Sequence, residues 1–275
     1  MPGELMNQTQ AMAIPRISIR EPPGMDSVFK KYLARGLAPK DAFELLRLSN
    51  GDITKFDRLA RRRAVFGEPL AYIRGSVEFM GRTFKVDKRV YVPNPETQRL
   101  TRLVIGDLSK NSVVGDIGTG SGCIAISIKL EKPEVTVFGA DIDPSSLKVA
   151  KANARAHGAK IRFYESSYAD TLFNSVKPTH IVADMPYGTP DFTYLLGSID
   201  VRDFAHMPQQ ALYHPDGTLK AYEELIDSIR NRGWNCRVFF ETGVVPKEEV
   251  RAIIPKGLAW EYRKFSGYSV TIVQT

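Results

Sequence analysis

From residue 113 to residue 264 the chain alternates short apolar runs with segments of helical pattern. Short runs rich in β-branched and aromatic residues are typical of buried strands. Strands that alternate with helices predict a parallel α/β sheet with helices on both of its faces. With one further run at the C-terminus, the candidate strands cover residues 113–117, 135–141, 161–165, 180–184, 236–242, 258–264 and 268–274.

The last two candidate strands are separated only by the segment FSG, residues 265–267. A parallel connection needs a crossover of about a dozen residues, so these two strands must form an antiparallel hairpin. A mostly parallel seven-stranded sheet that ends in an antiparallel hairpin is the architecture of Rossmann-like methyltransferases. We therefore expect an α/β protein with a Rossmann-like methyltransferase fold, preceded by a small helical domain.

The chain before this alternation has a different character. Residues 1–24 contain four prolines and few apolar anchors, and we expect a flexible tail there. Residues 25–75 contain about three segments of helical periodicity that end near glycines, which predicts a helical N-terminal domain. Residues 76–96 predict a β-hairpin about Gly81 and a stiff connector with two closely spaced prolines. Residues 97–275 then form the methyltransferase domain.

The net charge of +7 is concentrated at the front of the chain. Residues 1–90 contain 17 Lys or Arg and 10 Asp or Glu, which accounts for the whole excess, and residues 91–275 are balanced. A basic front module favours an acidic partner, either nucleic acid or an acidic protein face. A merely solvated basic surface is the alternative, and the triple arginine at residues 61–63 is open to both interpretations.

The cysteines, the histidines and the lengths of the apolar runs argue against a disulfide scaffold, a metal site and a membrane span. The two cysteines, Cys123 and Cys236, are too few for a disulfide scaffold and lie in apolar stretches, so we expect buried free thiols. The four histidines show no metal-ligand spacing, and we expect no metal. No apolar run approaches the roughly 18 residues that span a bilayer, and the N-terminus lacks the apolar core of a signal peptide. We therefore expect a cytoplasmic protein without a membrane partner.

A glycine-rich loop follows the first strand of the alternation. The stretch VVGDIGTGSGCIAI has the pattern of a strand, a loop and the start of a helix. Glycines let the backbone turn sharply and approach a ligand closely, and the helix N-terminus behind them offers unpaired N–H groups. A structural turn is the alternative, but the position between strand and helix favours a cofactor site. The candidate residues are Asp116, Gly118, Thr119, Gly120, Ser121 and Gly122.

A carboxylate follows the second strand. Asp141 comes 21 residues after Gly120, and an acid at this point of a nucleotide-binding sheet accepts hydrogen bonds from ribose hydroxyls. Asp143 instead has the position of a helix cap before Pro144. A simple loop carboxylate is the alternative for Asp141. The end of the third strand, in the segment YESSY at residues 164–168, should border the adenine.

The form of the glycine loop separates two classes of cofactor. A dinucleotide fingerprint is G-x-G-x-x-G and binds a pyrophosphate, whereas this loop is G-x-G-x-G and follows an acid, Asp116. A carboxylate beside the loop repels a phosphate and attracts the ammonium and sulfonium groups of S-adenosylmethionine. The sequence therefore favours S-adenosylmethionine over a nicotinamide dinucleotide.

The strand at residues 180–184 runs into the stretch Asp184, Met185, Pro186 and Tyr187. In a doubly wound sheet this strand end lies beside the glycine loop, so we expect the stretch to face the methyl donor. Methyl transfer to a planar nitrogen needs that nitrogen held in line with the methyl carbon. The Asp184 carboxylate and the Met185 carbonyl are suited to accept its two N–H bonds. The Tyr187 ring would pack on the planar group, and Pro186 would stiffen the turn. A tight turn with a buried tyrosine is the alternative.

Three stretches of the chain carry a resemblance to a known family. The segment GEPLAYIRGSVEFMGRTFKVDKRVYVPNPETQRL contains E-P-x-x-Y-I-x-G and P-x-P-E-T elements. The segment DIGTGSGCIAISI has the form of a cofactor loop, and MPQQALYHPDGTLKAYEELI is similar to an E-P-x-x-A-L…D-G…Y pattern. From about residue 27 to its end, the chain thus resembles the HemK-type protein glutamine methyltransferases, which modify a glutamine in peptide-chain release factors.

The resemblance implies an S-adenosylmethionine-dependent N-methyltransferase whose helical front domain docks a peptide-chain release factor. It implies that the substrate site covers residues 184–187 and that Tyr168 lies near the adenine. Together with the carboxylates and glycines named above, the implied cofactor set is Asp116, Gly118, Thr119, Gly120, Ser121, Gly122, Asp141, Ile142, Ser167, Tyr168 and Asp184.

Several positions differ from the residues that are usual in this family. The chain has Asp-Met-Pro-Tyr where the family usually has Asn-Pro-Pro-Tyr, and it has Asn94, Ser167 and Met207 where Arg, an acid and Glu are usual. An aspartate at the first motif position is seen more often in adenine amino methyltransferases that act on DNA or RNA. Two alternatives therefore stay open: an amino methyltransferase of nucleic acid, which the basic front would contact, and a cofactor-binding member without activity.

Overall fold

The computed structural model describes residues 24–169, 177–186, 201–217 and 219–275. Except for Gly24, the tail expected over residues 1–24 lies outside the described residues. The chain divides into two compact units, residues 1–64 and residues 65–275. None of the described helices has the length and apolar character needed to span a bilayer.

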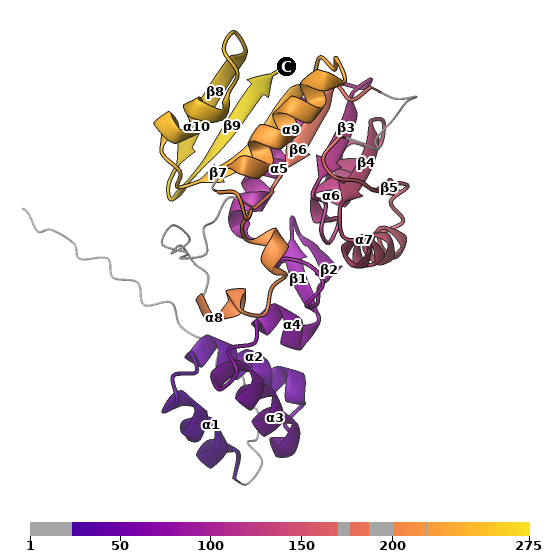
Figure 1. Ribbon diagram of the computed structural model, residues 1–275. Helices are drawn as coiled ribbons and strands as arrows, with labels where there is room; N and C mark the ends of the chain where they lie inside the picture. The colour runs from indigo at the N-terminus through magenta and orange to yellow at the C-terminus, as the bar shows by residue number, and fades with distance from the viewer. Residues whose placement is uncertain (1–23, 170–176, 187–200, 218) are drawn as a thin grey trace, which may run out of the picture. The chain divides into compact units, whose positions relative to one another are not determined.

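The described part of the first unit, residues 24–64, is a bundle of the helices α1 (Met25–Leu33), α2 (Pro39–Ser49) and α3 (Ile53–Ala64), shown in Figure 1. Each helix turns an apolar stripe inward, and Tyr32 and Phe56 are among the fully buried side chains. A buried ion pair joins Arg63 Nε on α3 to Asp41 Oδ2 on α2 at 2.9 Å. The last of the three consecutive arginines therefore stabilises the bundle instead of extending a basic surface.

The second unit begins with the short helix α4 (Leu70–Arg74) and a separate two-stranded sheet, β1 (Ser76–Phe79) and β2 (Arg82–Lys85). The two strands are antiparallel and turn at Gly81, so the expected hairpin is confirmed. Phe79 and Phe84 meet edge to face with ring centroids 6.0 Å apart, and both rings are buried. These rings join the core on one face of the main sheet, which anchors the hairpin there.

The main sheet contains seven described strands in the order β5-β4-β3-β6-β7-β9-β8 (Figure 1). They are β3 (Val113–Ile117), β4 (Thr136–Asp141), β5 (Arg162–Glu165), β6 (His180–Ala183), β7 (Arg237–Gly243), β8 (Ala259–Phe265) and β9 (Tyr268–Gln274). All pairs from β5 to β7 are parallel, and β9 is antiparallel to both of its neighbours. The expected parallel sheet with a terminal antiparallel hairpin is confirmed, and every strand lies within one residue of its predicted bounds.

Helices cover both faces of the main sheet (Figure 1). On one face α5 (Pro95–Asp107), α6 (Cys123–Glu131) and α7 (Pro144–Ala156) share a core with strand residues such as Val182 and Phe239. On the other face α9 (Lys220–Asn231) and α10 (Lys247–Ile253) share a core with Ala183 and Phe240. Successive residues of a strand point to opposite faces. Because helices cover both faces of this sheet, the residues of the central strands are buried on either side, and these strands appear in the sequence as continuous apolar runs. The remaining helical segments are α8 (Val201–Phe204) and the 3₁₀ turn η1 (Gln209–Ala211).

Two helices that border the functional site begin with a cap and a proline. The side chain of Asn94 accepts a hydrogen bond from the backbone N–H of Thr97 at 2.8 Å and caps α5. The side chain of Asp143 accepts one from the N–H of Ser145 at 2.8 Å and caps α7, as expected from the sequence. Each cap is followed by a proline, whose fixed φ suits the first helical position. These short-range contacts fix where both helices start.

The sheet has its switch point between β3 and β6. The chain proceeds from β3 to β4 and β5 in one direction, and β6 then lies on the other side of β3. The helices α6, which follows β3, and α9, which comes after β6 in the chain, pack on opposite faces, and ligands bind between such strand ends.

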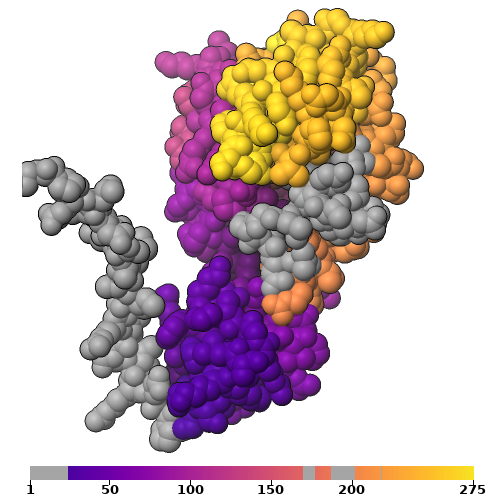
Figure 2. Space-filling view, turned by 90° about the vertical axis from the view of Figure 1, so that its left-hand side faces the viewer, coloured from indigo at the N-terminus to yellow at the C-terminus, as the bar shows by residue number. Residues whose placement is uncertain are grey.

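The outer strand β8 has no partner strand on its far side among the described residues. Its side chains include Glu261 and Arg263, whose carboxylate and guanidinium are 2.6 Å apart. Charged side chains on an edge strand discourage pairing with another chain. Figure 2 shows this C-terminal region in yellow as one continuous surface.

Candidate active site

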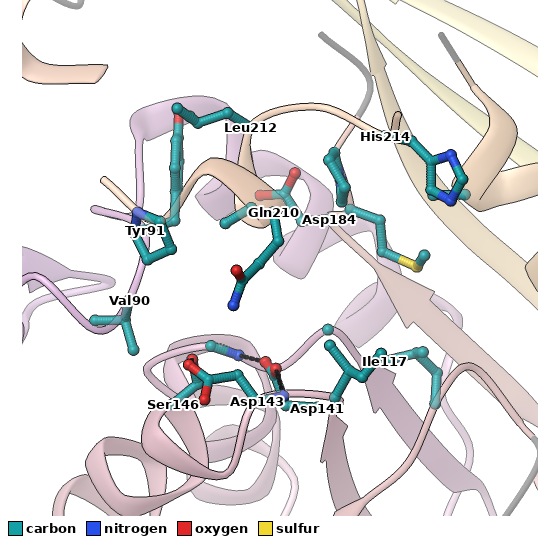
Figure 3. Close-up of a pocket in the computed structure, with 18 of the residues that line it drawn as sticks. Val90, Tyr91, Ile117, Asp141, Asp143, Ser146, Asp184, Gln210, Leu212 and His214 are labelled. Atoms are coloured by element: carbon teal, nitrogen blue, oxygen red, sulfur yellow. Dashed lines mark hydrogen bonds between the residues drawn. The ribbon is translucent and has the colours of Figure 1, made fainter. Parts of the chain in front are cut away.

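A cavity of ≈ 280 Å³ opens where the sheet order reverses, at the carboxyl ends of β3, β4 and β6 (Figure 3). Its walls come from the loops after these strands and after β5, from the segment before α5 and from residues 208–215. The structure thus brings together most of the site residues expected from the sequence. Those that line the cavity are Gly118, Gly120, Asp141, Ile142, Ser167, Tyr168, Asp184, Met185 and Pro186.

Four residues of the expected cofactor set do not line the cavity. Asp116, Thr119 and Ser121 are buried behind its wall, and Gly122 is the N-cap residue of α6. Their contacts point into the protein, so their direct role is to shape the loop. Tyr187, the aromatic residue of the expected acceptor site, lies outside the described residues.

Asp116 braces the glycine loop from inside. Its Oδ2 accepts a hydrogen bond from the Thr119 hydroxyl at 2.6 Å and another from the Ala125 N–H at 3.1 Å. Its Oδ1 is buried and has no hydrogen-bond partner among the described residues. Burial raises the pKa of Asp116 to about 7, and the nearby carboxylates of Asp141 and Asp184 act in the same direction. A cation bound above the loop would stabilise the ionised form of this side chain.

The glycines of the loop are needed for its shape. Gly118 has φ +73°, a backbone angle that residues with a side chain rarely adopt, and a Cβ there would lie 3.2 Å from Cγ of Met185. Gly120 has φ +52°, and its N–H donates a hydrogen bond to Asp141 Oδ2 at 2.8 Å. The loop therefore passes close to both neighbouring strand ends, and a larger residue would separate them.

Asp141 lies in the cavity wall at the end of β4 (Figure 3). One carboxylate oxygen accepts from the N–H of Gly120 at 2.8 Å, and the other accepts from the N–H of Asp143 at 2.9 Å. These two bonds hold the carboxylate in one orientation, and each oxygen keeps a further lone pair. Burial raises its pKa. The arrangement suits a carboxylate that accepts hydrogen bonds from the two hydroxyls of a ribose.

An apolar slot lies beside Asp141. Ile142 is 64% exposed, an unusual exposure for a large apolar side chain, and it lines the cavity with Tyr168 and Ser167. Tyr168 has φ +50°, a strained left-handed conformation for a residue with a side chain. An aliphatic and an aromatic side chain at this position suit the two faces of a planar base.

Asp184 follows β6 at the floor of the cavity and is held by the start of α5. Its Oδ2 is 2.6 Å from the hydroxyl oxygen of Thr97, and that hydroxyl is also 2.8 Å from Oδ1 of the capping Asn94. Oδ1 of Asp184 forms no hydrogen bond within the described part of the chain. Burial raises the pKa of Asp184 to about 6, which the Thr97 hydroxyl opposes and the charge of Glu96 supports. Asp184 therefore offers one free oxygen to a ligand.

Met185 differs from the expectation in one respect. Its carbonyl, expected to be open for the acceptor, already accepts a hydrogen bond from the Tyr222 hydroxyl at 3.0 Å. The N–H of Met185 donates to the same hydroxyl oxygen at 3.0 Å. The Met185 backbone is thus tied to α9, and only the second lone pair of its carbonyl remains for a ligand.

Sequence reasoning did not find several residues of the site. Tyr91, whose pKa is raised by burial, is hydrogen-bonded to the side chain of Asn94 and lines the cavity. Thr97 and Tyr222 hold residues 184–186, the reactive turn, and Gln210 projects into the cavity from η1 (Figure 3). The quoted P-x-P-E-T element contains Thr97, and the quoted D-G…Y pattern ends at Tyr222. Both residues therefore belong to elements that the sequence analysis quoted, but nothing in these elements indicates that Thr97 contacts Asp184 or that Tyr222 contacts Met185.

The charge around the cavity suits a cationic ligand. The lining includes the carboxyl groups of Asp141, Asp143 and Asp184, and Asp116 lies just behind it. The guanidinium of Arg89 also lines the cavity but is paired with Asp87 at 2.6 Å. A phosphate would meet repulsion here, whereas the sulfonium and ammonium groups of S-adenosylmethionine would be stabilised. The partnerless oxygen of Asp116 and the aligned carboxylate of Asp141 fit that cofactor.

A second cluster of possible ligands lies at the edge of the cavity. His214, Asp216 and Glu224 bring their ligand atoms within 4.8 Å of one another. The spacing of the histidines in the sequence did not reveal this group. Nδ1 of His214 accepts a hydrogen bond from the Asp216 N–H at 3.2 Å, and Nε2 faces Glu224 Oε2 at 3.7 Å. Because both ring nitrogens meet groups of the protein itself, we interpret the cluster as a structural polar contact.

Comparison with known proteins gives the following similarities. Residues 90–187 match the methyltransferase small domain family. A release factor glutamine methyltransferase of Staphylococcus aureus is 33% identical over 214 residues, which cover 74% of this chain and 72% of that protein. Another, of Neisseria gonorrhoeae, is 42% identical over 130 residues, 47% of each chain. A T. thermophilus 16S rRNA methyltransferase solved with S-adenosylmethionine and guanosine has the same fold, with a TM-score of 0.53 at 17% identity over 73% of this chain and 49% of that one.

Proposed function

Because the chain belongs to the release factor glutamine methyltransferase family, we propose that it methylates the side-chain amide of a glutamine in a peptide-chain release factor. The protein is an S-adenosylmethionine-dependent protein glutamine N-methyltransferase, which the family establishes. The observation that carries the assignment of the site is the position of Asp184. It lines the same cavity as the glycine loop and Asp141, and only one of its carboxylate oxygens, Oδ2, is bound by the Thr97 hydroxyl.

The cofactor would be held by the loop after β3 and the ends of β4 and β5. We assign the ribose to Asp141, the adenine to the slot of Ile142, Ser167 and Tyr168, and the charged methionine end to the loop backed by Asp116. When bound, S-adenosylmethionine supplies a methyl group on a positively charged sulfur. The acidic lining of the cavity favours that charge over the negative charge of a phosphate.

Asp184 would hold and orient the acceptor nitrogen. Its free Oδ1 accepts one N–H of the amide, and the remaining lone pair of the Met185 carbonyl accepts the other. Two acceptors fix the plane of the amide, so its nitrogen faces the methyl carbon. The same acceptors stabilise the positive charge that develops on nitrogen as the bond to carbon forms. Pro186 limits the motion of this turn, and the role of Tyr187 in packing on the amide stays a prediction.

The proton of the acceptor nitrogen needs a destination. As the nitrogen–carbon bond forms and the sulfur–carbon bond breaks, the nitrogen acquires a positive charge and becomes acidic. The carboxylate of Asp184 lies on the acceptor side and can take that proton on Oδ1. A pKa of about 6 allows the carboxylate to be ionised at neutral pH and to pass the proton to water afterwards.

We also propose that the helical N-terminal region, residues 25–75, docks the release factor, with residues 76–96 as linker and 97–275 as methyltransferase domain. Residues 24–64 contain ten Lys or Arg against five Asp or Glu, and one of each, Arg63 and Asp41, is buried as an ion pair. Such a surface suits an acidic protein face. A release factor acts in translation, so the expected cytoplasmic location remains consistent with the proposal.

Methylation of nucleic acid is the alternative that the sequence left open. The family favours a protein acceptor, and among the described residues that line the cavity Arg89 is the only Lys or Arg, with its guanidinium paired with Asp87. A member without activity is also less well supported, because Asp141, Asp184 and Met185, to which we assign binding of the cofactor and the acceptor, line one cavity.

The test is methyl transfer from tritiated S-adenosylmethionine to a panel of acceptors: a purified release factor, tRNA, rRNA and duplex DNA. We expect label on the release factor and, by mass spectrometry, one methyl group on a glutamine. Asp184→Ala should reduce the rate by orders of magnitude and leave cofactor affinity nearly unchanged, because the side chain holds the acceptor. Label on nucleic acid, or full activity of Asp184→Ala, would contradict the proposal.

A further inference from the structure

Two hydroxyl groups from opposite faces of the sheet meet the reactive turn. Thr97 lies at the start of α5, which packs on one face, and Tyr222 lies on α9, which packs on the other. One hydroxyl contacts the side chain of Asp184, and the other contacts the backbone of Met185. Neither Thr97 nor Tyr222 lines the cavity, whereas Asp184 and Met185 do. The two hydroxyl groups can therefore act on a ligand only through Asp184 and Met185.

We infer that Thr97 and Tyr222 are positioning residues that set the orientation of the acceptor site, Thr97 by aiming the Asp184 carboxylate and Tyr222 by fixing the Met185 backbone. The inference rests on the proposed function, because it assigns the two hydroxyls to the acceptor site and not to the cofactor. It also gives a physical role to two sequence elements, P-x-P-E-T and D-G…Y, that the assignment of the cofactor leaves unexplained.

The geometry at Thr97 selects which oxygen of Asp184 is free. The Thr97 hydroxyl has one proton and two acceptors, Asp184 Oδ2 at 2.6 Å and Asn94 Oδ1 at 2.8 Å. When Asp184 is ionised, the proton is held most strongly by the carboxylate, because hydrogen bonds to a charged acceptor are about twice as strong. Oδ2 is then occupied, and Oδ1 is left for the acceptor nitrogen. Rotation of the carboxylate would break the bond to Thr97.

The position of Thr97 is itself fixed. Its backbone N–H donates to the Asn94 side chain in the helix cap at 2.8 Å. The Thr97 side chain is only 2% exposed. A buried hydroxyl on a capped helix start has little freedom to move, so it transmits the position of α5 to Asp184.

Tyr222 plays the same part for the backbone. Its hydroxyl accepts the Met185 N–H and donates to the Met185 carbonyl, each at 3.0 Å, so both polar groups of one residue are bound to one atom. The ring is fully buried and stacks on Phe240 with centroids 4.5 Å apart. The carbonyl direction that the acceptor would meet is therefore set by a side chain that cannot move without disturbing the core.

Isosteric variants separate this role from simple stability. Thr97→Val removes the hydroxyl and keeps the shape, and Thr97→Ser restores the hydroxyl. Thr101→Val is the matched control, because it removes a fully buried hydroxyl one turn further along the same helix without contact to Asp184. Tyr222→Phe removes the second hydroxyl. Its control is Tyr262→Phe, which removes a hydroxyl that donates to the Val245 carbonyl at 2.8 Å away from the cavity.

The first readout does not depend on any acceptor. In carbon-13 NMR of aspartate-labelled protein, with the signal assigned through Asp184→Asn, Thr97→Val should raise the pKa of Asp184, because the ionised form loses its donor. Thr97→Ser and Thr101→Val should leave that pKa unchanged. Tyr222→Phe should accelerate hydrogen exchange of the Met185 amide by about tenfold or more, the effect of losing roughly one hydrogen bond. Tyr262→Phe should leave that exchange unchanged.

The second readout is methyl transfer to a purified release factor. We expect Thr97→Val to lower kcat by about 10–100-fold, since small misplacements of reacting groups have effects of that size. KM for S-adenosylmethionine should not change, and Thr97→Ser should restore kcat. The inference is overturned if Thr97→Val loses thermal stability as Thr101→Val does but keeps its kcat and the pKa of Asp184. If the wild type transfers no methyl group at all, the proposed function fails, while the NMR readout still decides whether Thr97 orients Asp184.

Discussion

Asp184 should give the reaction a pH dependence that an asparagine at the same position would not show. Only the ionised carboxylate can accept both the Thr97 hydroxyl and an N–H of the acceptor, and only that form can take up a proton. Asp184→Asn keeps the size of the side chain and one acceptor oxygen but cannot titrate. The comparison of these two proteins across pH therefore isolates the charge of Asp184.

The size of the effect follows from the burial of the carboxyl group. Burial raises the pKa of Asp184 from 3.8 to about 6. A rise in pKa of this size corresponds to about 3 kcal/mol. Because the pKa is higher in the folded state, the folded protein binds the proton more strongly than the unfolded chain. The ionised side chain thus lowers the stability of the protein by about 3 kcal/mol above pH 6, and this cost disappears as pH falls towards 4.

Two assays measure the two consequences. In a rate profile, kcat of the wild type should fall about tenfold per pH unit below a pH of about 6 and be constant above it. Asp184→Asn should be flat over that range. In urea denaturation, Asp184→Asn should be more stable than the wild type at pH 8, by up to about 3 kcal/mol, and the difference should vanish near pH 4.

Other titratable groups face Asp184, and they define what would refute the reasoning. They are Glu96 on α5, Asp116 at the end of β3, Cys123 on α6, Tyr91 before α5 and Tyr222 on α9. If the wild-type profile is flat through pH 6, Asp184 is not the group that must be ionised. If Asp184→Asn keeps the acid limb of the wild type, another group, with Asp116 the nearest in pKa, controls the rate.

Three further changes test the cofactor side of the site. Asp141→Ala should weaken binding of S-adenosylmethionine by tenfold or more in calorimetry, because it removes about 1.5–3 kcal/mol for each hydrogen bond to a charged acceptor, and unchanged affinity would contradict the ribose role. Asp116→Asn should also weaken cofactor binding, because it removes the negative charge buried behind the loop. It should nevertheless stabilise the free protein above pH 7, where the carboxyl group is otherwise ionised in a buried position. Equal affinity and equal stability would show that this charge is irrelevant. Gly118→Ala should destabilise the protein by about 1–2 kcal/mol, the cost of a left-handed residue with a side chain, and thermal unfolding at the wild-type temperature would show that the φ of +73° is not required.

The parts of the structure that the sequence predicts are those set by local chemistry. The strands were predictable from short apolar runs, and the hairpin of β8 and β9 followed from a connection too short to cross over. Asp143 was separated from Asp141 because a residue before a proline and a helix has the position of a cap, and its side chain does accept the Ser145 N–H. Each of these inferences depends on residues within one or two turns of one another.

The parts that could not be predicted depend on contacts between distant residues. Thr97 and Asp184 are 87 positions apart, and Met185 and Tyr222 are 37 apart, so no periodicity or spacing connects them. The same holds for the direction of the Met185 carbonyl, which is decided by where α9 packs. Asp116 was predicted from its charge, but whether its carboxylate faces the cavity or braces the loop depends on the side from which α6 approaches.

The most direct measurement is a crystal structure of the protein with S-adenosylmethionine and a glutamine peptide of its release factor. We predict that the ribose hydroxyls bind Asp141 and that the methyl group faces the acceptor nitrogen at about 3–3.5 Å. Oδ1 of Asp184 should accept an N–H of that amide while Oδ2 stays on the Thr97 hydroxyl. An Asp184 side chain turned away from the amide, or a cofactor bound outside this cavity, would contradict the account.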